Sequence, residues 1–200
     1  IRAGFLNSPI PLGLAAPTVA VDLTLGPYPE DPDADPDADP DADPDNPRNL
    51  IAETRVYIYT FVNKVGAREI ESPPSPPSLS VDVFPNQTVT LELFQTPASP
   101  YVATHVRIYR STAGAFLYVD EIPIATAVGT GYVDSVDPED LAEEIPSIGW
   151  LPPPDDLKGL INLPNGSMAG FDGRDIFFCE PYVPHAWPDE YRQSIDHPVV

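Results

Sequence analysis

The stretch ETRVYIYTFV at residues 53–62 decides the fold of this chain. From position 56 onward it contains only β-branched and aromatic residues, which favour the pleated backbone of a strand. Side chains of a strand alternate between two faces, so positions 56, 58 and 60 share one face and positions 57, 59 and 61 share the other. Both faces are apolar. The sequence therefore predicts a strand that is covered on both sides, either at the centre of a sheet or against another domain.

Shorter strands are predicted on both sides of this stretch. The stretch is followed by a turn around Gly66 at residues 63–68. After the turn comes a proline-rich, extended connection, ESPPSPPS, at residues 71–78. Apolar alternation of period two marks the other strands, at residues 18–25, 79–84, 88–94, 104–110, 115–122 and 131–136. Seven or eight short strands with turns at this spacing predict an all-β fold, an antiparallel sandwich. No helix is predicted before residue 138.

An acidic repeat, DPDADPDADPDADPD at residues 31–45, precedes the central strand. Residues 27–47 hold nine acidic residues and seven prolines but no basic residue. Proline removes a backbone donor and like charges repel, so this composition cannot build a helix, a ladder or an apolar core. We expect a solvated, extended linker or surface loop with neither helix nor strand.

Calcium binding is the alternative interpretation of the acidic repeat. Carboxylates on alternate residues are hard oxygen ligands, and D-x-D-x-D begins several calcium loops. The repeat lacks the glycine at position six and the glutamate at position twelve of an EF-hand loop. An acidic linker is therefore favoured, and no other cofactor is predicted. The calcium candidates are Asp33, Asp35, Asp37, Asp39, Asp41 and Asp43.

Composition and motifs exclude several classes of protein. A net charge of −21 over 200 residues argues against a nucleic-acid backbone or an anionic membrane surface as partner. The single cysteine, Cys179, lies in an apolar run, so we expect it in the core. There is no run of 18 apolar residues, so no membrane span is predicted.

Catalytic motifs are also missing from the sequence. The three histidines, His105, His185 and His197, do not have the spacing of a metal site, and no G-x-S-x-G elbow occurs. A glycosidase with paired carboxylates is a weaker alternative, because solvation alone explains the many acidic residues. We therefore predict that the chain is not an enzyme and has no catalytic residue.

The pattern changes after residue 138. Residues 138–145 (PEDLAEEI) begin with proline and acids, as one or two helical turns do, and a triple proline follows at 152–154. Turns at Asn165-Gly166 and Asp172-Gly173 then predict a β-meander that the chain does not complete. The predicted parts are an N-terminal segment (1–26), an acidic linker (27–48), a sandwich (49–137, which the strand at 18–25 could join), a proline-rich linker (138–156) and a partial meander unit (157–200).

Aromatic residues and prolines gather in the last third of the chain. Such side chains can form a platform for a carbohydrate or a peptide, or they can lock an irregular segment onto a neighbouring domain or subunit. The second interpretation is favoured, because proline-rich segments have few backbone donors to hold them in place. We expect residues 72–78, 151–155 and 182–188 to leave much of their surface to neighbours. The interface candidates are Trp150, Tyr182, His185, Trp187 and Tyr191.

Two stretches resemble parts of a fibronectin type III module. Residues 57–77 (YIYTFVNKVGAREIESPPSPP) are similar to its end, a tyrosine-rich strand followed by a glycine turn and an E-S-x-P-S-like exit. Residues 104–111 (THVRIYRS) are similar to its central strand. The exit-like piece comes first in this chain, so the resemblance implies a fibronectin-like sandwich with a permuted or rearranged strand order.

A longer succession of motifs at residues 53–200 resembles virion-associated proteins of tailed bacteriophages, in which a fibronectin-like sandwich adjoins a β-propeller-like region. Its pieces include LPNGSMAGFDG at 163–173 and EPYVPHAWP at 180–188. The resemblance implies a structural component of the phage tail or tail tip, with other virion proteins as partners and a homo-oligomeric ring or several copies in the particle. The alternative is a secreted or surface module that binds a carbohydrate or a protein, with the acidic run as a calcium-stabilised linker. Both ends break off within β-like sequence, so we also expect a fragment or a processed product.

Overall fold

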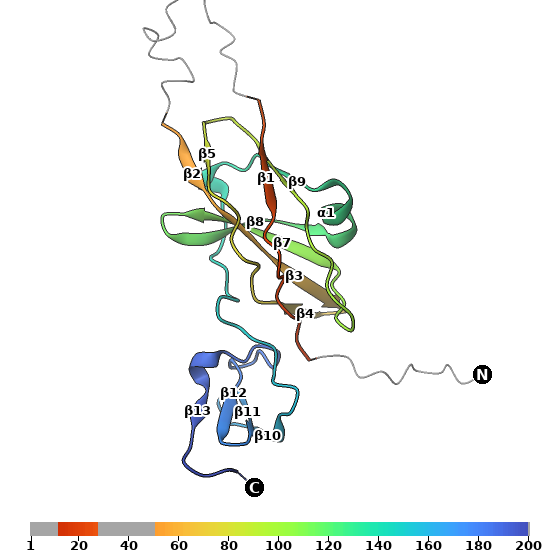
Figure 1. The fold of residues 1–200 in the computed structure, drawn as a ribbon, viewed down its shortest axis with the longest axis vertical. Coiled ribbons are helices and arrows are strands. Elements are labelled where there is room, and N and C mark those ends of the chain that lie inside the picture. Colours follow the sequence, from red (N-terminus) through yellow and green to blue (C-terminus); the bar gives the residue numbers. More distant parts are fainter. Residues whose placement is uncertain (1–11, 28–50, 200) are drawn as a thin grey trace, which may run out of the picture.

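The computed structural model describes residues 12–27 and 51–199. A β-sandwich forms the larger part, and a small four-stranded unit follows it at one end, after an extended linker (Figure 1). The acidic repeat and its calcium candidates lie outside the described residues, so the expectations about them stay predictions. No helix within 12–27 or 51–199 is long and apolar enough to span a membrane.

Two antiparallel sheets form the sandwich, as the sequence predicts. One has the order β1 (Asp22–Leu25), β6 (Val89–Glu92), β9 (Tyr132–Asp134). The other has the order β4 (Arg68–Glu71), β3 (Tyr57–Val65), β7 (His105–Thr112), β8 (Ala115–Pro123). A separate pair, β2 (Glu53–Arg55) with β5 (Val81–Val83), lies at one end. The predicted all-β sandwich is confirmed.

The stretch that decides the fold supplies two strands instead of one. It divides at Val56, so that β2 pairs with β5 while β3 lies between β4 and β7. Residues 57–62 of β3 are all buried. The face that carries Tyr57, Tyr59 and Phe61 packs in the main core between the sheets. On the other face Ile58 packs in a second, smaller cluster. The prediction of a central strand covered on both sides is confirmed.

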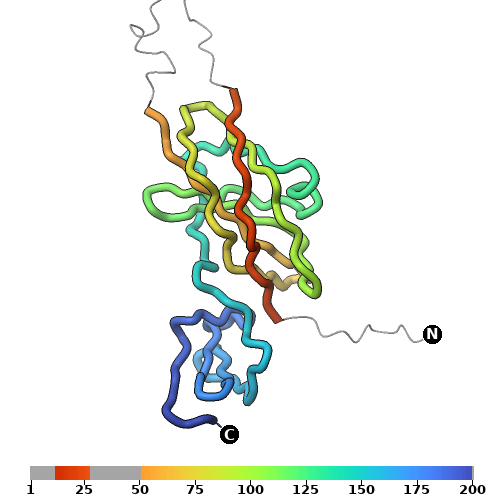
Figure 2. Tube along the Cα trace, in the orientation of Figure 1, coloured from red at the N-terminus to blue at the C-terminus, as the bar shows by residue number. Residues whose placement is uncertain are grey.

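The N-terminal segment lies along the whole length of the sandwich (Figure 2, red). Leu14 and Val21 are buried in the main core, and β1 pairs with β6. The hydroxyl of Tyr59 donates a hydrogen bond of 3.0 Å to the carbonyl of Val19. Residues 12–27 therefore form part of the sandwich.

Residues 72–78 continue the pairing of β4 along β3. Three serines, one at every third position, are each joined to β3 in two ways. Their backbone N–H groups donate to carbonyls of β3, and their hydroxyl oxygens accept the N–H groups of the same β3 residues. The pairs are Ser72 with Phe61, Ser75 with Tyr59 and Ser78 with Tyr57, at 2.8–3.1 Å.

The prediction that residues 72–78 leave much of their surface to neighbours is wrong. Ser72, Ser75 and Ser78 are buried against the strand they pair with. Proline has no N–H to donate, so a segment with two prolines in three cannot form an ordinary ladder. The intervening serines supply both a backbone donor and a side-chain acceptor, which satisfies the edge of β3 within the same domain.

A helix that the sequence did not predict follows β8. α1 (Ile124–Thr130) has seven residues, IATAVGT, too few to show a helical period, and it buries Ala127 in the main core. Conversely, residues 138–145 contain only the short 3-10 turn η2 (Pro138–Asp140). Beyond it the chain runs extended beside β8, where Tyr118 N–H donates to the carbonyl of Glu143 at 2.9 Å. The outer edge of β8 is thereby covered.

The C-terminal unit is the predicted antiparallel meander. Its sheet has the order β10 (Lys158–Asn162), β11 (Met168–Asp172), β12 (Asp175–Phe178), β13 (Gln193–Ser194). Between β12 and β13 the chain is irregular apart from the 3-10 turn η3 (Asp189–Tyr191). Cys179 is buried, as predicted. The buried apolar residues of this unit are Ala169, Cys179, Ala186, Trp187 and Pro188.

Candidate functional site

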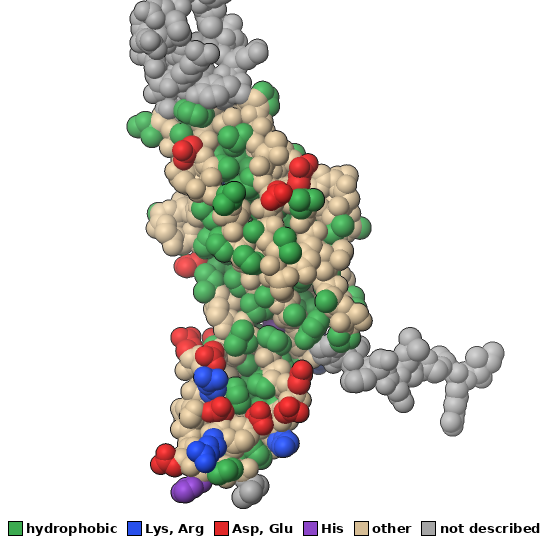
Figure 3. Space-filling model, viewed as in Figure 1, with side chains coloured by type: hydrophobic (Ala, Val, Ile, Leu, Met, Phe, Trp, Pro, Cys, Tyr) green, Lys and Arg blue, Asp and Glu red, His purple; other side chains and the backbone are tan. Residues whose placement is uncertain are grey.

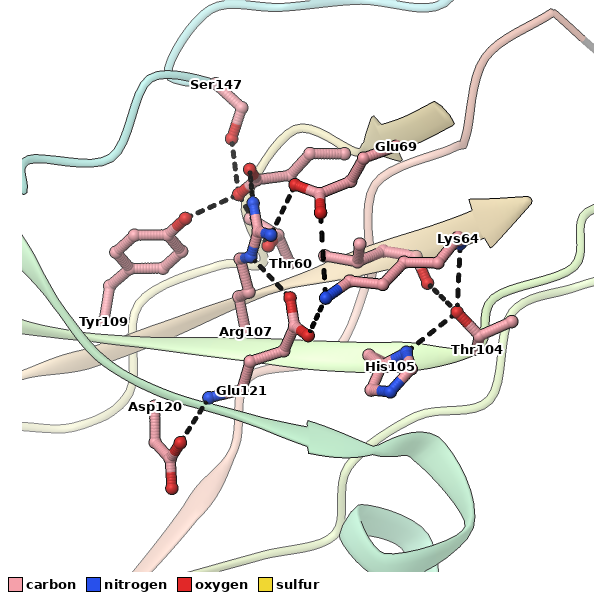
Figure 4. Close-up of polar contacts among 12 residues, drawn as sticks. Thr60, Lys64, Glu69, Thr104, His105, Arg107, Tyr109, Asp120, Glu121 and Ser147 are labelled. Atoms are coloured by element: carbon pink, nitrogen blue, oxygen red, sulfur yellow. Dashed lines mark hydrogen bonds and ion pairs between the residues drawn. The ribbon is translucent and has the colours of Figure 1, made fainter. Parts of the chain in front are cut away.

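The outer face of the four-stranded sheet carries a network of charged side chains (Figure 4). Arg107 lies at its centre: its Nε is 2.8 Å from Glu121 and its Nη1 is 2.9 Å from Glu71. Its Nη2 also pairs with Glu69. Lys64 forms a second bridge between Glu121 and Glu69. The five residues come from four adjacent strands, because outward-facing positions of paired strands lie next to one another.

Glu71 is the buried end of this network. Its carboxylate accepts hydrogen bonds from Thr60 at 2.8 Å and from the Tyr109 hydroxyl at 2.7 Å. Burial, together with the adjacent Glu71 charge, raises the pKa of Tyr109, so this hydroxyl stays protonated and donates. Burial acts to lower the pKa of Arg107, but the charge of Glu71 and the contact with Glu69 outweigh it and raise the pKa. Arg107 therefore stays charged and paired.

A hollow of about 450 Å³ lies between this network and residues 142–146. Tyr109 and Tyr118 contribute two rings to it in an edge-to-face arrangement, with centroids 6.1 Å apart. Lys64, Arg107 and Glu121 line it but are already joined to one another or to Glu69 and Glu71. The arrangement stiffens the sheet and offers a contact surface. Glu143 and Glu144 line its other side.

A second polar cluster joins the two sheets inside the sandwich. Asp134 of β9 accepts from Arg110 Nη1 at 2.8 Å and from the Tyr57 hydroxyl at 2.7 Å. Arg110 and Asp134 are both fully buried. Arg110 Nη1 also donates to the carbonyl of Val136 at 2.8 Å. Burial and the Asp134 charge raise the pKa of Tyr57, which keeps its proton in this bond. The cluster holds β3, β7 and β9 together.

Three of the predicted interface residues lie where the C-terminal unit meets its linker. Trp187 is 2% exposed, and its Nε1 donates to the carbonyl of Pro184 at 3.0 Å. Its backbone N–H donates to Leu151 at 2.9 Å. Trp150 and His185 are half-buried and pack edge to face, with ring centroids 5.7 Å apart. These side chains hold the linker on the unit within this chain.

The other two predicted interface residues, Tyr182 and Tyr191, are exposed. Tyr182 is 82% exposed, has a φ of 65° and lies against Gly166, where a β-carbon would come within 2.6 Å of its ring. Tyr191 donates its hydroxyl to the Glu180 carboxylate at 3.2 Å. The charge of Glu180 raises the pKa of Tyr191. The hydroxyl of Tyr191 therefore stays protonated at neutral pH and continues to donate to Glu180. Tyr191 also lines a second hollow, of about 420 Å³, in the C-terminal unit.

Sequence reasoning missed the charged network because its members come from four different strands. Arg107 and Glu121 lie in predicted strands. Lys64 lies in the stretch predicted as a turn and Glu69 lies just after it, so only the register of the folded sheet places these four side chains next to one another. Within residues 12–27 and 51–199, no group of three or more His, Cys, Asp or Glu side chains could hold a metal ion.

Among known proteins, no family model matches this chain and no curated protein matches it significantly. The resemblance to virion proteins of tailed phages therefore stays a prediction.

Proposed function

We propose that the chain is a non-enzymatic structural component of a bacteriophage particle, in the tail or tail tip, which acts through contacts with other virion proteins. The observation that supports this best is the open edge of the C-terminal sheet. All five residues of β10 are exposed, and Leu160 and Ile161 are 52% and 57% exposed. An exposed edge strand with apolar side chains is a template for contact with another chain.

The sandwich has the properties of a rigid spacer for such contacts. Residues 72–78 and 142–145 cover the edges of β3 and β8, and buried polar groups tie its two sheets together. Its cations are mostly engaged, with Arg55, Lys64, Arg107 and Arg110 all in ion pairs. In Figure 3 the visible Lys and Arg side chains lie on the C-terminal unit, not on the sandwich. The face of the sandwich seen there is apolar and acidic.

The second candidate function is a secreted or surface module that binds a carbohydrate or a protein. The two hollows favour it, because each is about the size of a small-ligand site and each contains at least one tyrosine ring. Calcium stabilisation of the acidic linker would belong to this alternative. The two functions differ in assembly, since the first requires several copies in a particle.

Mass spectrometry and electron microscopy of purified particles test the first proposal. We expect the chain in intact virions, and we expect Leu160→Lys with Ile161→Lys to reduce its incorporation. Leu79→Lys is the matched control, because Leu79 is an exposed leucine of the sandwich. Absence of the chain from virions would overturn the proposal. A monomer whose melting temperature rises sharply with millimolar calcium would support the second function instead.

A further inference from the structure

The hollow of about 420 Å³ in the C-terminal unit is built from three separate stretches of chain. The turn after β10 contributes Asn165 and Ser167, the end of β12 contributes Phe178, and the turn η3 with β13 contributes Glu190, Tyr191 and Gln193. Its volume lies within the range of small-ligand sites, and it is open to solvent on one side. Folding of the unit is needed to assemble it, since other residues separate these stretches in the sequence.

One wall of the hollow is an exposed aromatic ring that is held in place. Tyr191 is 36% exposed, yet its hydroxyl is fixed by the Glu180 carboxylate at 3.2 Å. The backbone of Glu180 is held in turn, because its N–H donates to the carbonyl of Ala186 at 2.9 Å. A ring that is ordered before a ligand arrives loses little conformational freedom on binding. Phe178 adds a second apolar surface to the hollow.

The polar side chains that line the hollow are two amides, two hydroxyls, the thiol of Cys179 and one carboxylate. Gln193 carries a donor and an acceptor side by side, and Glu190 carries two acceptors. Asn165 offers its amide N–H groups, because its Oδ1 already accepts the backbone N–H of Ser167 at 3.1 Å. No Lys, Arg or His side chain lines the hollow within the described part of the chain. A phosphate or another anion would therefore meet only the negative charge of Glu190. The lining suits a neutral ligand with neighbouring hydroxyl groups and an apolar face.

Tyr182 does not line the hollow, but it packs on the turn that contributes Asn165 and Ser167, and its backbone is strained. Its φ of 65° is unusual for a residue with a side chain, and its ring lies on Gly166, between the lining residues Asn165 and Ser167. Backbone strain of this kind is costly and is concentrated at functional sites. The ring of Tyr182 is 82% exposed, so a second tyrosine of this unit is open to solvent.

We propose that this hollow binds a neutral pyranose sugar. A pyranose has a face of C–H groups that packs on an aromatic ring and an edge of hydroxyls that hydrogen-bond to amides and carboxylates. Tyr191 would contact the C–H face, while Asn165, Gln193 and Glu190 would bind the hydroxyls. The proposal does not depend on the structural role, because a chain absent from virions could still bind a sugar. It deepens the second candidate function by naming the hollow and the class of sugar.

Saturation-transfer NMR on the full chain tests this site. The probes are the methyl glycosides of glucose, galactose and rhamnose, and N-acetylglucosamine. We expect transfer to the ring protons of at least one sugar, with a dissociation constant of about 0.1–10 mM, as is usual for a ligand with so few atoms. Gln193→Ala should weaken binding by about fivefold, the effect of losing one or two hydrogen bonds. Tyr191→Ala should abolish it.

Two further variants keep the test decisive. Asn162→Ala removes an exposed amide from β10, on the opposite edge of the same sheet, and should leave binding unchanged. Tyr191→Phe keeps the ring but removes the bond to Glu180, and it should weaken binding without loss of fold even if Tyr191→Ala unfolds the unit. The proposal is overturned if none of the four sugars shows transfer. It is equally overturned if transfer survives both Gln193→Ala and Tyr191→Phe unchanged, or falls as much with Asn162→Ala.

Discussion

The sandwich and the C-terminal unit are both antiparallel β structures, but they are stabilised in different ways. The sandwich buries 14 apolar residues in one continuous core between two sheets. The C-terminal unit has one sheet, and its buried apolar side chains are two alanines, a cysteine, Pro188 and Trp187. A single sheet has no second layer to cover it, so irregular chain and one large ring take that role.

This difference separates the rigid part of the molecule from the part that offers its surface. In the sandwich, residues 72–78 and 142–145 pair with strands that would otherwise expose their edges. In the C-terminal unit β10 is open, and two tyrosines are exposed on the chain that leads back to β13. Contacts and ligands are therefore expected at the C-terminal unit, and the following experiments test the comparison.

The largest effect is expected from Asp134→Ala in the sandwich. The change leaves the Arg110 guanidinium buried without its carboxylate, which typically costs about 3–5 kcal/mol. Urea unfolding followed by circular dichroism measures the loss. Asp137→Ala, at a nearby exposed position, is the control and should change the free energy of unfolding little. A loss below about 1 kcal/mol for Asp134→Ala would show that the buried pair does not join the sheets as described.

Trp187→Ala should unfold the C-terminal unit and leave the sandwich intact. Removing a buried tryptophan costs about 3 kcal/mol or more, and this unit has few other buried side chains. Hydrogen exchange followed by mass spectrometry should show fast exchange in β10–β13 and unchanged protection in β3 and β7. Trp150→Ala, at a half-buried position, is the control and should have a smaller effect. Equal loss of protection in both parts would contradict the comparison.

Ser75→Ala should destabilise the sandwich by about 1–2 kcal/mol. The backbone N–H of Tyr59 loses its hydroxyl acceptor at a buried position, and an unsatisfied buried donor costs about that much. Thermal or urea unfolding gives the measurement. Ser80→Ala is the matched control, since Ser80 is exposed. If both variants are equally stable, the serines do not hold residues 72–78 on β3.

The smallest effect is a difference in acid sensitivity between the two parts. Burial lowers the pKa of His185 below 6.5, so the folded unit favours the neutral imidazole. The contribution of His185 to the stability of the C-terminal unit is therefore present above pH 6.5 and is lost as the pH falls below that value. For Glu121, burial acts to raise the pKa, but the bond from Lys64 and the charge of Arg107 lower it below 4.5. Its contribution to the sandwich is therefore present above pH 4.5 and is lost below that value.

On acidification we expect faster hydrogen exchange first in the C-terminal unit and only later in the sandwich. His185→Phe should remove the first change, while His105→Gln should not. Simultaneous loosening of both parts, or an unchanged profile in His185→Phe, would contradict this assignment.

The sequence by itself determined the local features of this protein. Alternation of period two and β-branched residues at 56–62 predicted the central strand, and glycine turns predicted the meander after residue 157. The apolar run around Cys179 predicted a buried cysteine. These features can be read from neighbouring residues because backbone propensity and turn geometry act over a few positions.

The tertiary structure alone decided the features that depend on pairing between distant segments. The break at Val56, the attachment of Ser72, Ser75 and Ser78 to β3, and the charged network around Arg107 all follow from strand register. The helix α1 is too short to have a period of its own, and the sugar-sized hollow joins three separate stretches. The register of a strand depends on which apolar faces pack against each other in the folded chain. A sequence pattern identifies the apolar faces, but it does not determine which two of them will pack together.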